Sequence, residues 1–114
     1  TGLGKAFLAF LPRQESGEII DQIEFEGYTK KTVRNKEELE KQLEQFRKQG
    51  YSIDNEEIEE GLWCIAVPVY DGSRRMVAAI SVSGPIDRML SKKDKLTREL
   101  LETSRKLSGQ LGYH

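Results

Sequence analysis

The stretch that decides the fold runs from Gly50 to Pro85 and reads GYSIDNEEIEEGLWCIAVPVYDGSRRMVAAISVSGP. Its pattern predicts a strand at residues 51–53, an acidic connector, and a β-hairpin that turns at Asp71-Gly72. Side chains alternate between two faces along a strand. One face of this hairpin would carry Trp63, Ile65, Val67, Val69, Met76, Ala78, Ile80 and Val82. The other would carry Cys64, Ala66, Pro68, Val77, Ala79, Ser81 and Ser83. We expect the large residues to face a core, and the small ones to face either a ligand or a closely packed helix.

The expected register of the hairpin follows from the length of its turn. A two-residue or four-residue loop centred on Gly72 and Ser73 pairs residues whose numbers sum to 145. Cys64 would then lie opposite Ser81, and both would belong to the small-residue face. A three-residue loop would break this match between the faces of the two strands.

Helical periodicity predicts helices at residues 2–11, 16–23 and 35–49, and a last helix that begins near Ser91. Asn35 and Glu38 have the spacing of a capping box, and Gly50 suits a left-handed helix end. In the last helix Asp94 is the expected capping partner. The expected buried stripe consists of Leu96, Leu100, Leu107 and Leu111. An edge strand is predicted at residues 28–33.

Helices that alternate with a clear antiparallel hairpin predict an α+β domain with a mixed or antiparallel sheet. Only three or four strands are visible, and Thr1 stands directly before a helix. We therefore expect residues 1–114 to be a fragment of a domain, or to have part of the sheet supplied by a partner.

Composition limits the function. The 114 residues suit one domain, with 18 basic and 19 acidic residues and a net charge of −1. Such a balanced charge does not indicate binding to nucleic acid or to an anionic membrane. No apolar run approaches the ~20 residues that span a bilayer. One cysteine and one terminal histidine leave almost no material for a disulfide, a metal site or histidine catalysis, so a reducing cytoplasm is expected.

Two further segments offer polar groups to a ligand. The Thr1-Gly2-Leu3-Gly4 start of the first helix would present unpaired amides, although the residues alone favour a flexible entry to an ordinary helix. It is not a phosphate-binding loop, because the required glycine spacing is absent. Asp54 ends a strand, where its carboxylate can face the small residues. The carboxylates that follow it lack the glycine of a calcium loop. Cys64 has no activating base nearby, so we interpret it as a buried residue or pocket wall.

Three segments resemble the effector-binding domain of the IclR family of bacterial transcriptional regulators. They are TGLGKAFLAFLP (1–12), LEQFRKQGYSIDNEEIEEGLWCIAVPVYD (43–71) and VAAISVSGP (77–85). The resemblance implies a GAF-like fold, with a curved antiparallel sheet flanked by helices and with the family's N-terminal strands absent before Thr1. It also implies a small-molecule effector, often a carboxylate or an aromatic compound. Operator DNA would be bound only through an N-terminal domain that this chain lacks.

The resemblance also implies roles for individual residues. The backbone amides of Gly2 and Leu3 and the side chain of Asp54 would contact the effector. The apolar wall would come from Leu62 and Cys64, and the hydroxyls from Ser81 and Ser83. Neither a cofactor nor a metal is implied. Trp63 departs from the polar residue common in relatives, which suggests apolar partner contacts or a changed ligand preference.

Two functions from different classes therefore compete. The first is a sensor of a small organic acid or related metabolite. The second is a module for self-association as a dimer or tetramer, with a vestigial pocket. An enzyme that uses Cys64 or Asp54 is disfavoured, because no base–nucleophile pair is evident.

Overall fold

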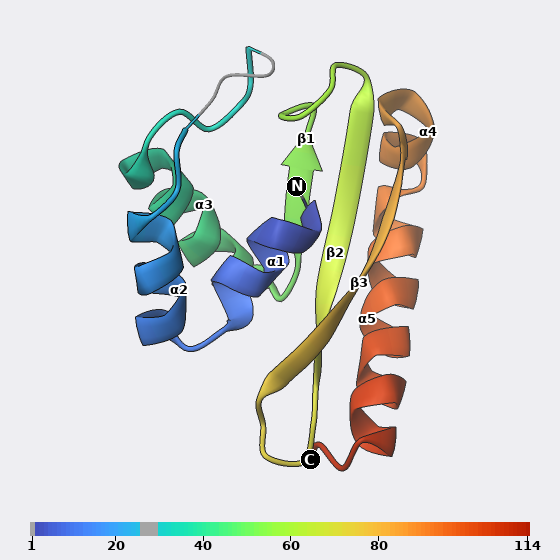
Figure 1. Ribbon diagram of the computed structural model, residues 1–114. Coiled ribbons are helices and arrows are strands. Elements are labelled where there is room, and N and C mark those ends of the chain that lie inside the picture. Colours follow the sequence, from blue (N-terminus) through green and yellow to red (C-terminus); the bar gives the residue numbers. More distant parts are fainter. Residues whose placement is uncertain (1, 26–29) are drawn as a thin grey trace.

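The computed structural model describes residues 2–25 and 30–114, which fold into a three-stranded antiparallel sheet with helices on both faces (Figure 1). The strand order is β1-β2-β3. The elements, in chain order, are α1 (Gly2–Phe10), α2 (Arg13–Asp21), α3 (Lys36–Gln49), β1 (Ser52–Asn55), β2 (Leu62–Tyr70), β3 (Met76–Pro85), α4 (Ile86–Ser91) and α5 (Lys93–Gln110). Helix α1 lies against one face of the sheet, and α5 runs along the other. The predicted α+β class is confirmed, and the sheet is antiparallel.

The two faces of the hairpin differ as predicted. Trp63, Ile65 and Val67 are buried with Met89 of α4 and Leu100 of α5 in one core cluster. Trp63 is only 2% exposed, so the expectation that it makes apolar contacts with a partner is wrong, and the changed ligand preference stays a prediction. The side chains on this face are large and apolar, as those of a core are, and α4 and α5 cover them.

The small-residue face packs against a helix at one end and borders a hollow at the other. Around Ala66 it packs against Ala6 of α1, with Met76 in the same cluster. The two alanines allow the helix to lie close to the sheet. Helix α1 begins at Gly2, however, and the end of the face that carries Cys64 and Ser83 borders a hollow rather than a packed helix.

The predicted hairpin register is wrong by two residues. Cys64 lies opposite Ser83, not Ser81. The connection between Tyr70 and Met76 is longer than expected, and a bulge in β3 near Val77 compensates for its odd length. Because the bulge flips the alternation, Met76 faces α1 instead of the core beneath α5.

Local capping fixes the ends of α3 as predicted. The Asn35 side chain accepts a hydrogen bond from the Glu38 amide at 2.9 Å, and the Glu38 carboxylate accepts one from the Arg34 amide at 3.1 Å. Gly50 ends the helix at φ 89°, a conformation that costs glycine little. Arg47 also holds α1, because its Nε donates to the Ala9 carbonyl at 2.8 Å.

The C-terminal prediction needs correction. Residues 86–91 form the separate helix α4, and α5 begins at Lys93 without a side-chain cap from Asp94. Leu107 and Leu111 are exposed, while Leu100, Ser104 and Ser108 are buried. The serines are buried because they bond to the β2 backbone. Ser104 donates to the Pro68 carbonyl, and the Ser108 hydroxyl accepts from the Tyr70 amide at 3.0 Å.

Two smaller predictions also differ. Helix α2 begins and ends earlier than residues 16–23, and β1 lies one or two residues later than 51–53. Of the predicted edge strand at 28–33, residues 28 and 29 lie outside the described residues, and residues 30–33 form a turn and irregular backbone.

Candidate ligand-binding site

A hollow of about 250 Å³ lies where the start of α1 meets the open end of the small-residue face. Its lining comes from α1, β1, the connector after β1, and both hairpin strands. The residues are Leu3, Asp54, Ile58, Leu62, Cys64, Ser81 and Ser83. Six of the seven predicted site residues therefore line one hollow. The seventh, Gly2, is the first residue of α1 and directly precedes Leu3.

Strand register positions the polar side chains. Asp54 pairs with Cys64, and Cys64 pairs with Ser83, so the three form one row across the sheet. The next row on the same face consists of Ser52, Ala66 and Ser81. Since directly paired residues share a face, the register places Asp54 and the two hairpin serines on the same side.

Asp54 is the buried polar group of the site. Its residue is 5% exposed, and its Oδ1 accepts a hydrogen bond from the Glu57 amide at 2.9 Å. This bond fixes the first turn of the connector after β1. A buried carboxylate requires hydrogen-bond donors, and a ligand hydroxyl or a water can supply a further one.

The other lining residues supply hydroxyl groups and an apolar wall. Ser81 and Ser83 lie on β3, which is one of the two edge strands of the described sheet, and both are exposed. Hydroxyls at such positions can donate to a ligand oxygen. Cys64 is buried and 9% exposed, with its Sγ 3.9 Å from the Ile65 carbonyl oxygen. It forms part of the wall together with Leu62 and Ile58.

Sequence reasoning missed Ile58. Its signal was available, because Ile58 is the one apolar residue among four glutamates at positions 56–60. It is 39% exposed and borders the hollow from the connector. A large apolar side chain in a solvated connector indicates that this part of the connector folds back over the site.

Within residues 2–25 and 30–114, no cluster of histidine, cysteine, aspartate or glutamate has the arrangement of a metal site. No helix in the same ranges has the length and apolar character needed to cross a bilayer.

The sequence and the fold match one class of protein. The family model described as "Bacterial transcriptional regulator IclR C-terminal" matches residues 1–109. The chain belongs to the IclR family of bacterial transcriptional regulators and corresponds to its C-terminal domain.

Individual relatives support this assignment. The chain is 44% identical to the HTH-type transcriptional regulator KdgR of Dickeya chrysanthemi, covering 100% of this chain and 38% of that protein. The solved C-terminal domain of KdgR from E. coli matches at 40% identity and a TM-score of 0.91, covering 99% of this chain and 70% of that one. A double mutant of the PobR inducer-binding domain from Acinetobacter, solved with 3-hydroxybenzoic acid, matches at 26% identity and a TM-score of 0.84, covering 95% and 63%.

These matches confirm the predicted family. The curated relatives are named as regulators and repressors, in agreement with the prediction that the chain is not an enzyme. The chain spans less than half the length of the curated relatives that it matches.

Proposed function

We propose that this chain is the sensing part of a transcriptional regulator and that a small organic acid binds in the hollow between α1 and the hairpin. The observation that carries the proposal is the convergence of three kinds of group on one space. These are the start of α1, the buried Asp54 carboxylate, and the hydroxyls of Ser81 and Ser83.

Each group has a role in binding. The amides of Gly2 and Leu3 stand at the N-terminus of a helix, where the dipole favours an anion, so they would hold the ligand carboxylate. Ser81 and Ser83 would donate hydrogen bonds to ligand oxygens. Asp54 would accept one from a ligand hydroxyl, and Leu62, Cys64 and Ile58 would contact its carbon atoms.

The size and the relatives support a small acid. The hollow, at about 250 Å³, is slightly below the ~300–1,000 Å³ of typical small-molecule sites, which favours a ligand of few carbon atoms. The double mutant of the PobR inducer-binding domain, solved in complex with 3-hydroxybenzoic acid, provides a related fold that binds an aromatic acid. A hydroxy or keto acid would use the amides, the serines and Asp54 together.

Binding would regulate transcription through the full-length protein. Operator DNA would be bound by a separate DNA-binding domain, in the cytoplasm. The ligand would shift the regulator between two states only as far as it binds one of them better. Self-association as a dimer or tetramer would bring two such domains to one operator. Leu107 on α5 and Leu111 directly after it are exposed and available for such contacts.

A thermal-shift screen of small organic acids on the full-length protein would test the proposal, because a bound ligand raises the unfolding temperature. The variants Ser83→Ala and Asp54→Asn should abolish the shift. Asn keeps an acceptor for the Glu57 amide but loses the negative charge. Thr103→Ala, which removes an exposed hydroxyl on α5, is the matched control. An unchanged shift in both site variants would refute the assigned hollow, and self-association without any ligand response would favour the alternative of an interaction module.

A further inference from the structure

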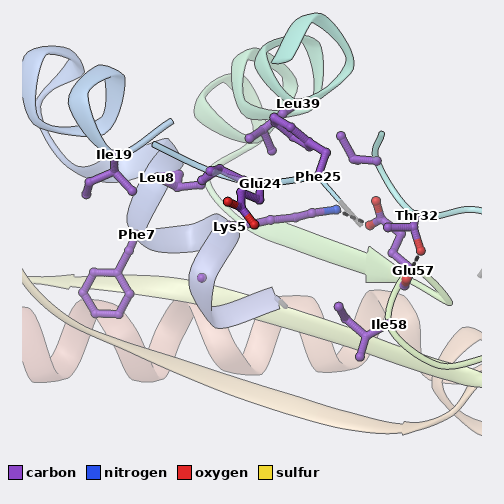
Figure 2. A pocket seen from close by; sticks show the side chains of 13 residues that line it. Lys5, Phe7, Leu8, Ile19, Glu24, Phe25, Thr32, Leu39, Glu57 and Ile58 are labelled. Carbon is purple, nitrogen blue, oxygen red and sulfur yellow. Dashed lines mark hydrogen bonds and ion pairs between the residues drawn. The ribbon is translucent and has the colours of Figure 1, made fainter. Parts of the chain in front are cut away.

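A second and larger cavity, of about 370 Å³, lies between α1, α2, α3 and the connector after β1 (Figure 2). Its walls are mainly apolar, with Leu8, Phe25, Val33 and Leu39 among them. Ile58 is the one residue that lines both this cavity and the proposed effector hollow. The volume falls within the ~300–1,000 Å³ range in which small-molecule sites occur.

A buried ion pair supplies the polar part of this cavity. The Lys5 ammonium contacts the Glu57 carboxylate, and the two residues are 8% and 4% exposed (Figure 2). Gln42 donates to the same carboxylate at 3.1 Å, and the Thr32 hydroxyl donates to the Glu57 backbone carbonyl. These contacts come from α1, α3 and the segment before α3, so the pair is held from several sides.

The charges around the cavity decide which ligand it can accept. Lys5 and Glu57 neutralise one another, and the exposed Glu24 at the lining adds one negative charge. An anion would meet this negative charge and would have to separate a buried pair, which is costly. A neutral molecule meets neither obstacle, and its polar group can bond to the outer atoms of the pair.

The rim of the cavity presents large apolar side chains to solvent. Phe7 is 37% exposed, Ile19 45% and Ile58 39%. All three also belong to the lining of the cavity, so part of its apolar wall is exposed to solvent. They would bury their exposed area against the apolar body of a ligand.

We infer that this cavity is a second binding site, separate from the effector hollow, for a neutral aromatic or aliphatic molecule that carries one hydrogen-bonding group. The Lys5–Glu57 pair is the polar anchor of this site, and the Phe7, Ile19 and Ile58 side chains enclose the apolar body. The inference does not depend on the effector proposed for the other hollow.

Two fluorescent probes with the same aromatic core test the charge argument on the full-length protein. N-phenyl-1-naphthylamine is neutral, and 1-anilinonaphthalene-8-sulfonate is the same scaffold with a negative charge. We expect the neutral probe to bind about tenfold more tightly, because only the sulfonate must be desolvated beside Glu24 and a buried pair. Equal or tighter binding of the sulfonate would overturn the inference.

Three variants locate the bound probe. Ile19→Glu places a charge at the rim and should weaken the neutral probe about tenfold. Leu90→Glu makes the same kind of change at an exposed helix position that lines neither site and should have no effect. Ser83→Phe fills the effector hollow and should leave the probe bound. Loss of binding in Ser83→Phe or Leu90→Glu, or unchanged binding in Ile19→Glu, would overturn the inference.

Discussion

The buried ion pair between Lys5 and Glu57 joins residues that are 52 apart in the sequence. Its contribution to the free energy of unfolding can be tested by substitution. The pair ties α1 to the connector that also carries Ile58. The variant Lys5→Met keeps most of the apolar stem of the lysine but removes the charge. Glu57 would then be a carboxylate, 4% exposed, without its cationic partner.

The expected cost is large because the remaining charge is buried. Removing one partner of a buried pair typically lowers the free energy of unfolding by about 3–5 kcal/mol. Gln42 and the surrounding contacts remain, so we expect the lower part of that range, about 3 kcal/mol. The double variant Lys5→Met with Glu57→Gln removes both charges and should recover most of this loss.

Urea unfolding of the three variants and the unaltered protein, analysed as a double-mutant cycle, measures these values. The matched control is the Lys36–Asp21 pair, whose side chains are 47% and 64% exposed. Lys36→Met should cost much less than Lys5→Met, because exposed pairs are screened by water. If Lys5→Met costs as little as Lys36→Met, or if the double variant is less stable than Lys5→Met alone, the reasoning about the buried charge is refuted.

Two further perturbations test the polar contacts of the hairpin. Ser108→Ala removes the acceptor of the Tyr70 amide and should lower the free energy of unfolding by about 1–3 kcal/mol. The control Thr103→Ala, on the exposed side of α5, should change this free energy little. Equal effects of the two variants in urea unfolding would contradict the expectation. In the turn, the hydrogen bond from the Ser73 hydroxyl holds the pKa of Asp71 below its ordinary value of 3.8. A carboxyl with a lowered folded pKa contributes stability that is present above the ordinary value and is lost as the pH falls through the folded pKa. Ser73→Ala should therefore raise the pKa of Asp71 towards 3.8 in an NMR titration and reduce this acid-dependent loss, and an unchanged pKa would show that the hydroxyl is not its cause.

Local sequence signals were sufficient wherever the governing interaction is local. Asn35, Glu38 and Gly50 set the ends of α3 through contacts within a few residues, and all three were predicted. Alternation along the hairpin predicted which residues of β2 face the core. Six of the seven residues that line the proposed effector hollow followed partly from this alternation and partly from the family resemblance.

Interactions between distant segments could not be predicted from local sequence patterns. The bulge near Val77 depends on how the whole turn closes, so the register and the side of the sheet that Met76 faces were wrong. The burial of Ser104 and Ser108 depends on backbone groups of β2, which are more than thirty residues earlier in the chain. Hydrophobic periodicity predicts burial only for apolar side chains, so it favoured burial of the neighbouring leucines instead.

By itself, the sequence determined the fold class, the hairpin with its two unlike faces, and the chemistry available for binding. Periodicity and capping act within a few residues and do not require the rest of the chain. Only the tertiary structure decided that Asp54, Cys64 and Ser83 form one row, because strand register depends on the loop and the bulge together. It also decided that Lys5 meets Glu57 beside a second cavity, because a charge can be buried at tolerable cost only where the folded chain brings an opposite charge into contact with it.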